Sequence, residues 1–114
     1  MELRILGAHN MESDRTHFEA HLVDGVLALD AGSLTRTLTF EEQRKIGAIL
    51  LSHRHFDHTR DLLPLGINIR DTGVTVEVYA IQDTVDHVGS KLLDGTIYPV
   101  SPTQPTAENP SIRL

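Results

Sequence analysis

Three histidines and one aspartate lie within six consecutive residues near the middle of the chain. They belong to the segment His-Arg-His-Phe-Asp-His at residues 53–58. Imidazole and carboxylate groups are ligands that zinc, manganese and iron accept in proteins. The 114 residues include no cysteine, so a metal here would be held without thiolates. The segment therefore predicts a metal site.

The spacing within this segment suits two metal ions. His53 and His55 are two positions apart and can share one ion, whereas a tight bend would direct the adjacent Asp57 and His58 at a second position. Two metals about 3.5–4 Å apart stabilise both the attacking and the leaving oxygen of a hydrolytic displacement. The residues thus point to metal-dependent hydrolysis.

The elements on either side of the segment must position it. Residues 46–51 form an almost continuous apolar run, which predicts a strand buried on both faces that ends at the histidines. Upstream, Asp24-Gly25 separates two alternating runs at 18–23 and 26–29, the pattern of a hairpin with a type I′ turn. Thr39 and Glu42 have the spacing of a capping box, so a short helix is expected after Thr39.

The remaining patterns predict a layered fold. Strands alternating with helices indicate an α/β (α+β layered) domain with a mostly antiparallel or mixed sheet flanked by helices. This domain is expected over residues 1–100, and residues 101–114 are expected to be an extended, proline-rich tail or linker that is truncated. The further elements expected are strands at 3–7, 74–81 and 97–100, a helix at 61–65 broken by Pro64, and a helix at 83–93.

Composition restricts the partners. The formal net charge is −6, which gives no support to nucleic-acid binding because that needs a basic face. No apolar run reaches the roughly 18 residues of a membrane span, so no membrane partner is expected. The first residues lack the apolar stretch of a signal peptide. We therefore expect a soluble, cytoplasmic protein.

Two motifs resemble those of a known family. Ser52 and residues 53–58 resemble the His-x-His-x-Asp-His signature of the metallo-β-lactamase superfamily. Leu29-Asp30-Ala31-Gly32 is similar to its first motif, an aspartate at a strand end followed by glycine. The resemblance covers about residues 3–100. A weaker similarity, in the segments 38–46 and 76–99, is to the branch that contains class II cyclic-nucleotide phosphodiesterases.

The resemblance implies roles for individual residues. His53 and His55 would bind the first metal, and Asp57 and His58 the second. Asp57 would also help to position a metal-bound hydroxide that attacks an ester or phosphodiester bond, and Asp30 would orient a ligand histidine. Two zinc ions are expected per complete site, with manganese or iron as alternatives, and no organic cofactor is expected. The substrate that the resemblance implies is a small molecule or a phosphodiester.

The family fold consists of two similar halves in an αββα sandwich, and later motifs supply its remaining ligands. No histidine follows His87, which we expect in a helix and not as a ligand. The sequence thus predicts the first half of such a sandwich, either a fragment or a half completed by a second chain. The alternative is a non-catalytic module that docks on a partner and has an incomplete metal site. We expect Phe56 to face the core.

Overall fold

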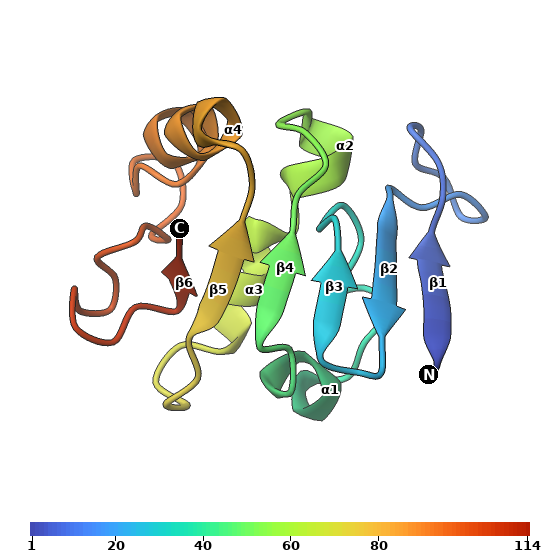
Figure 1. Cartoon of the computed structure of the whole chain (residues 1–114), viewed down its shortest axis with the longest axis horizontal. Helices are drawn as coiled ribbons and strands as arrows, with labels where there is room; N and C mark the ends of the chain where they lie inside the picture. Colours follow the sequence, from blue (N-terminus) through green and yellow to red (C-terminus); the bar gives the residue numbers. More distant parts are fainter.

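Six strands form one mixed sheet whose spatial order follows the chain, β1 to β6 (Figure 1). The computed structural model describes residues 1–114. The strands are β1 Leu3–Gly7, β2 Ala20–Val23, β3 Leu27–Leu29, β4 Ala48–Leu50, β5 Val76–Tyr79 and β6 Ile112–Arg113. The helices are α1 Phe40–Arg44, α2 Phe56–Thr59, α3 Leu62–Asn68 and α4 Gln82–His87, and α4 continues as a π-helical turn, η1 Val88–Leu92.

Strand direction places the ends of the central strands at one edge of the sheet. The neighbours β1–β2 and β2–β3 are antiparallel, whereas β3–β4, β4–β5 and β5–β6 are parallel. Parallel neighbours need crossover connections, and these contain all of the helices. The residues that follow β3, β4 and β5 therefore emerge at the same edge, at the top of Figure 1.

Two local predictions are confirmed. Asp24 and Gly25 both have positive φ, 52° and 72°, and the Val26 N–H donates to the Val23 carbonyl at 3.1 Å, as a type I′ turn requires. At α1, the Thr39 hydroxyl accepts from the Glu42 N–H, and the Glu42 carboxylate accepts from the Thr39 N–H. Both signals are confined to four residues, so they hold independently of the rest of the fold.

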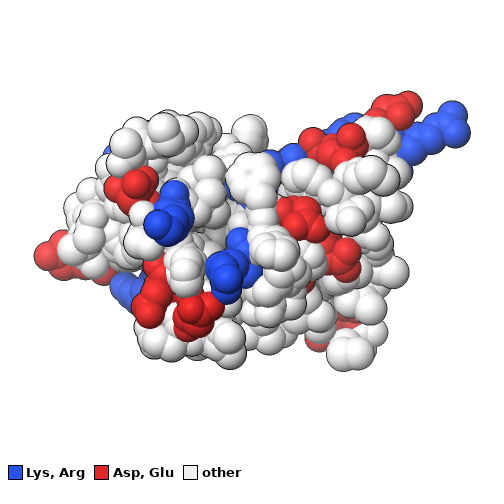
Figure 2. All heavy atoms as spheres, turned by 90° about the horizontal axis from the view of Figure 1, so that it is seen from above, with Lys and Arg blue, Asp and Glu red and all other residues white.

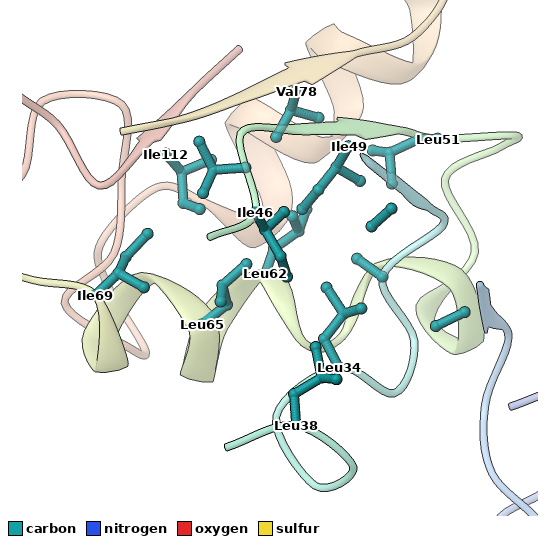
Figure 3. Packing of buried hydrophobic residues seen from close by; sticks show 14 of the residues in the cluster. Leu34, Leu38, Ile46, Ile49, Leu51, Leu62, Leu65, Ile69, Val78 and Ile112 are labelled. Carbon is teal, nitrogen blue, oxygen red and sulfur yellow. The ribbon is translucent and has the colours of Figure 1, made fainter. Parts of the chain in front are cut away.

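The core lies between one face of the sheet and α3. Leu22, Ala28, Ile49 and Val78 form one row across β2 to β5, and all are buried. Leu62 and Leu65 of α3 pack into the same cluster, which Figure 3 shows from close by. This apolar layer lies on one side of the sheet. It holds β4 in place, and the histidine segment begins after β4.

The other face of the sheet carries no helix (Figure 1). Strand pairing aligns two rows of side chains on it, and we call this surface the open face. The rows are Leu3, Val23, Leu27, Ala48, Glu77 and Arg113, and Ile5, His21, Leu29, Leu50 and Tyr79. The prediction that strand 46–51 is buried on both faces is therefore wrong, because Leu50 is 42% exposed. A continuous apolar run does not by itself show what covers each face.

The C-terminal stretch also differs from expectation. Residues 97–100 form no strand, and the sixth strand is β6, where Ile112 pairs with Val76 and is fully buried. Residues 101–114 therefore do not form an extended tail, because their end adds a strand to the sheet. A two-residue strand has no periodicity that a sequence pattern could reveal.

Two helices differ from expectation in detail. Pro64 does not break α3, because it lies in the first turn, where a backbone N–H needs no partner within the helix. Phe56 begins α2 and is 55% exposed, so its expected place in the core is wrong. No helix of the structure has both the length and the apolar character needed to cross a membrane.

Candidate metal centre

Asp30 and Ser52 meet at the edge where β3 and β4 end. Asp30 is buried and has a left-handed backbone, with φ of 63°, and its N–H donates to the Leu50 carbonyl at 2.8 Å. Its carboxylate accepts the Ser52 backbone N–H at 2.7 Å. The Ser52 Oγ lies 3.0 Å from Oδ1 and 2.8 Å from Oδ2 of the same carboxylate. The parallel pairing of the two strands thus brings together residues 22 positions apart in sequence.

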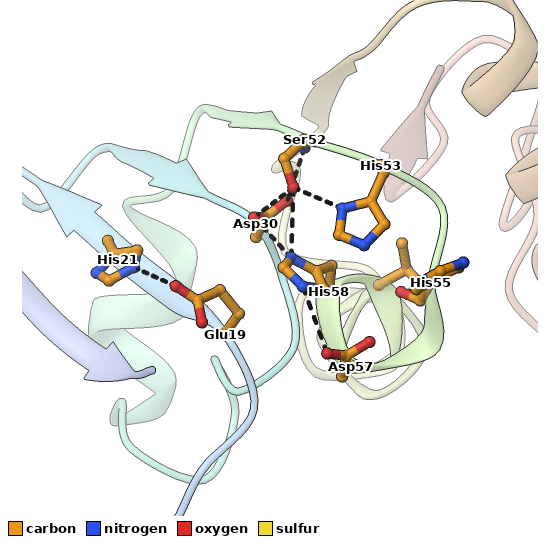
Figure 4. A network of polar contacts seen from close by, with 9 residues as sticks. Glu19, His21, Asp30, Ser52, His53, His55, Asp57 and His58 are labelled. Carbon is orange, nitrogen blue, oxygen red and sulfur yellow. Dashed lines mark hydrogen bonds and ion pairs between the residues drawn. The ribbon is translucent and has the colours of Figure 1, made fainter. Parts of the chain in front are cut away.

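His58 connects this carboxylate to Asp57 (Figure 4). Its Nδ1 lies 2.8 Å from Asp30 Oδ2 and its Nε2 lies 3.4 Å from Asp57 Oδ2. Because a carboxylate only accepts hydrogen bonds, the His58 Nδ1–H donates to Asp30. A neutral His58 ring therefore directs the lone pair of Nε2 at the Asp57 carboxylate.

This pair of facing acceptors fits a divalent cation. Zinc binds imidazole nitrogen and carboxylate oxygen at roughly 2.0–2.2 Å with tetrahedral geometry, so two of its ligand atoms are about 3.3 Å apart. The 3.4 Å between His58 Nε2 and Asp57 Oδ2 is close to that value. The donor set and its spacing are thus compatible with the predicted second metal.

His53 and His55 lie on the segment between β4 and α2, and their rings are close to that of His58 on α2. The ring centroids of His53 and His58 are 4.0 Å apart, and those of His53 and His55 are 4.7 Å apart, edge to face. His53 Nδ1 lies 3.0 Å from the Ser52 Oγ. His55 is exposed and is the residue before the first turn of α2. The three imidazoles thus form a contiguous group.

Backbone contacts hold α2 against the turn after β3 and against the residue before β2. The Ala31 N–H donates to the His58 carbonyl at 2.7 Å, and the Glu19 N–H donates to the Asp57 carbonyl at 3.1 Å. Gly32 lies so close to α2 that a Cβ atom there would be 1.9 Å from the Asp57 carbonyl oxygen. Gly32 is therefore required for this close approach, and it determines where Asp57 and His58 stand.

An arginine behind α2 is held by two carboxylates. Arg60 contacts Glu12 at 2.7 Å and Asp61 at 2.9 Å, and its guanidinium lies 4.5 Å from the centre of the Phe18 ring. Partial burial opposes the charged form, but the hydrogen bonds to Glu12 and Asp61 outweigh it and raise the pKa of Arg60. Arg60 thus links the loop of residues 8–17 to α2, and it is not free to meet an anion.

The second arginine of this region is also paired. Arg54 donates to Asp83 of α4 at 2.7 Å. Figure 2 looks onto this end of the molecule and shows acidic and basic side chains interspersed, without a single-sign patch. Positive charge is therefore not concentrated at this end of the molecule.

Three of the four other histidines have local partners, whereas the buried Nδ1 of His17 has none. His21 bonds Glu19 at 2.8 Å, His87 contacts the carbonyl of Asp83 at 2.8 Å, and His9 accepts from a neighbouring backbone N–H at 3.2 Å. None of the three contacts a member of the 53–58 segment through these bonds. His87 lies in a helix, α4, as expected, and its partner belongs to the same helix.

The four predicted ligands are close neighbours but are not preassembled. No group of three or more His, Asp or Glu side chains is arranged so that it could hold a metal ion. The ligand assignment of His53, His55, Asp57 and His58 therefore stays a prediction, as does the role of Asp57 in hydrolysis. The sequence did not single out Ser52 or Gly32 for a role, although both lie within the quoted motifs.

Comparison with known proteins identifies the family. The family model described as "Beta-lactamase superfamily domain" matches residues 21–112. None of the curated protein sequences matches the chain.

Two solved structures have a similar fold. Unliganded yeast PDE1 superimposes with a TM-score of 0.77 at 13% identity, over 98% of this chain and 49% of that one. The metallo-β-lactamase fold protein YhfI from Bacillus subtilis gives 0.59 at 23% identity, over 74% and 38%. The chain thus spans about half the length of PDE1 and less of YhfI. With the family match over most of its length, the chain belongs to the beta-lactamase superfamily and has part of the metallo-β-lactamase fold.

Proposed function

We propose that this chain carries the first part of the metal centre of a hydrolase. His53 and His55 would hold one ion, Asp57 and His58 the second, and zinc suits this donor set, with manganese or iron as alternatives. The observation that carries the proposal is the His58 ring, bonded to Asp30 through one nitrogen and facing Asp57 with the other. Divalent cations bound at such sites lower the pKa of coordinated water to near 7 and polarise the bond that is cleaved.

The protein's own residues would supply orientation. Asp30 holds the His58 ring in the tautomer that leaves Nε2 free, which is a common arrangement behind metal-ligating histidines. Asp57 would bind metal and direct the attacking water toward the substrate. Gly32 keeps the start of α2, and with it Asp57, against the turn after β3.

We propose an ester or phosphodiester as the substrate. The fold is shared with yeast PDE1, whose name is that of a phosphodiesterase, and this agrees with the similarity of the sequence to the phosphodiesterase branch. Arg54 and Arg60 are occupied by Asp83 and by Glu12 and Asp61. Recognition of an anionic substrate would therefore rest mainly on the metals and on residues supplied from elsewhere.

Metal binding by the chain itself tests the site. We expect zinc to bind weakly, because catalytic zinc sites use three protein ligands and each ion has two here. His55→Ala and Asp57→Asn should each weaken binding at least about tenfold in calorimetric titration. His87→Ala is the matched control, because this histidine lies on α4 and bonds its own helix. Equal zinc binding by the wild-type chain and the double variant His55→Ala/Asp57→Asn would exclude the site.

A second candidate is a non-catalytic half-fold that docks on a partner. It is favoured by the absence of any three donors around one point. It predicts that purified protein contains no stoichiometric metal and that its unfolding temperature does not respond to zinc or to a chelator. Metal analysis together with thermal unfolding separates it from the first proposal.

For either function we propose that a second sheet, supplied by the rest of a longer protein, covers the open face. Most side chains of the open face are apolar, and its charged groups are already paired, Arg113 with Glu77 and His21 with Glu19, each at 2.8 Å. Covering it would thus leave no unpaired charge buried. The chain spans only 49% of PDE1, which leaves ample length for a second sheet in a protein of that size.

The open face can be tested on the chain alone. A chain with this face uncovered should bind an apolar fluorescent dye, and Leu50→Lys should reduce that binding. Phe40→Lys is the control, because Phe40 is also exposed but belongs to α1. Equal dye binding by wild type and Leu50→Lys would contradict the proposal, and a dimer abolished by Leu50→Lys would show that a second copy covers the face instead.

A further inference from the structure

We propose that Ser52 is a positioning residue that extends the hold of Asp30 from His58 to His53. This inference rests on the metal site proposed above, but it concerns the hydrogen bonds of the metal-free protein. The Ser52 Oγ lies within hydrogen-bond distance of both oxygens of Asp30 and of His53 Nδ1. Ser52 is thus the only polar link between the His53 ring and the Asp30 carboxylate.

The direction of each bond follows from counting hydrogens. The Asp30 carboxylate has no hydrogen to donate and can only accept. The single hydroxyl hydrogen of Ser52 therefore points to Asp30, at 2.8–3.0 Å. With that hydrogen used, the Ser52 Oγ can act only as an acceptor toward His53, 3.0 Å away.

His53 must then carry its hydrogen on Nδ1. The His53 Nδ1–H donates to Ser52, just as the His58 Nδ1–H donates to Asp30. Without such a partner, a neutral imidazole is free to carry its hydrogen on either nitrogen. Both rings are consequently fixed in the tautomer that leaves the Nε2 lone pair available to a metal, and both depend on one buried carboxylate.

Two groups of Ser52, its hydroxyl and its backbone N–H, bond to Asp30 and hold the residue in place. The Ser52 backbone N–H also donates to Asp30, at 2.7 Å, so the residue is anchored at two atoms. The Ser52 Oγ lies 3.3 Å from His58 Nδ1, farther than the 2.8 Å between that nitrogen and Asp30. His58 therefore depends directly on Asp30, and His53 depends on it through the hydroxyl of Ser52.

This difference gives a test with a built-in comparison. In metal-free protein, held well above the usual imidazole pKa of about 6.5, ¹⁵N NMR distinguishes the two tautomers of each ring. We expect Nδ1–H for both His53 and His58 in the wild type. Ser52→Ala should release only His53 to a mixture of tautomers, whereas Asp30→Asn should release both rings.

A second measurement tests the consequence for metal. Loss of a hydrogen-bond partner behind a ligand histidine lowers metal affinity typically 10–100-fold, so Ser52→Ala should weaken zinc binding by about that factor. Ser52→Thr retains the hydroxyl at an exposed position and should restore both the His53 tautomer and the affinity.

Failure of this inference is distinct from failure of the proposed function. An Nε2–H tautomer of His53 in the wild type, or a His53 tautomer that Ser52→Ala leaves unchanged, would overturn it whether or not zinc binds. The expected tautomers in a chain that binds no zinc would instead support the hydrogen-bond relay and refute the metal site. The wild-type spectrum decides the matter even if a variant fails to fold.

Discussion

Substituting alanine for Gly32 should displace α2 and weaken both the fold and the metal site. The added Cβ atom would lie 1.9 Å from the Asp57 carbonyl oxygen and 2.7 Å from the Cβ of Phe18. Ordinary van der Waals contact begins at 3.4 Å, so the backbone at Asp57 would have to retreat by about 1.5 Å, the difference between the two values. Backbone atoms cannot rotate away as the end of a long side chain can, so the helix itself must move.

The cost follows from two contributions. Overpacking of a well-packed interior destabilises by about 1–3 kcal/mol. The retreat of Asp57 also breaks the hydrogen bond that its carbonyl accepts from Glu19, worth about 1 kcal/mol. We therefore expect Gly32→Ala to lower the free energy of unfolding by roughly 2–4 kcal/mol. In a chain of this size each kcal/mol shifts Tm by about 4 °C, so Tm should fall by roughly 8–16 °C.

Urea denaturation and zinc titration of the same preparation would measure both effects. Gly47→Ala is the matched control, because a Cβ at Gly47 has no neighbour within 4 Å, and its effect should stay within about 0.5 kcal/mol. Zinc affinity should fall about tenfold or more in Gly32→Ala and stay unchanged in the control. A Gly32→Ala chain with wild-type stability and wild-type zinc affinity would refute the claim that this close approach positions α2.

Two further predictions concern the helix α1 and the strand β6. Hydrogen bonds from the Thr39 backbone N–H and from the Arg4 side chain lower the pKa of Glu42 from 4.5 to about 2. The contribution of ionised Glu42 to stability is therefore complete above about pH 4.5 and is lost as the pH falls through about 2. Glu42→Gln should flatten the dependence of Tm on pH in that range. Glu41→Gln is the control and should not. Ile112 is fully buried, so Ile112→Ala should lower the free energy of unfolding by about 2–5 kcal/mol in urea denaturation. Ile97→Ala, at a residue 93% exposed, should have almost no effect, and equal stability of the two variants would mean that β6 does not belong to the folded sheet.

The parts of the fold that the sequence predicts correctly are those determined by neighbouring residues. The Asp24-Gly25 turn and the Thr39 cap each depend on contacts within four positions, and both occur as expected. The metal ligands in residues 53–58 were likewise inferred from residue types alone, and they stay a prediction. Such features need no knowledge of what packs against them.

The parts that the sequence misses depend on distant partners. The pairing of Ile112 with Val76 joins residues 36 positions apart, and nothing near Ile112 marks it as a strand. Leu50 is exposed because no element of this chain covers it, and an apolar run does not show which elements will pack on a strand. The contact that makes Gly32 necessary is with Asp57, so the sequence shows only a glycine after a strand.

The same distinction separates the orientation of the ligands from their number. Asp30 and Ser52 follow β3 and β4, which contribute Ala28 and Ile49 to the core behind the sheet. His58 lies on α2, which is hydrogen-bonded to the turn after β3, and none of these contacts involves the open face. Orientation of the imidazoles is therefore a property of this chain. Metal affinity, in contrast, depends on how many donors reach each ion, and here no three do. Adding the proposed second sheet should thus strengthen zinc binding without changing the tautomers of His53 and His58, because hydrogen bonds within this chain already fix them.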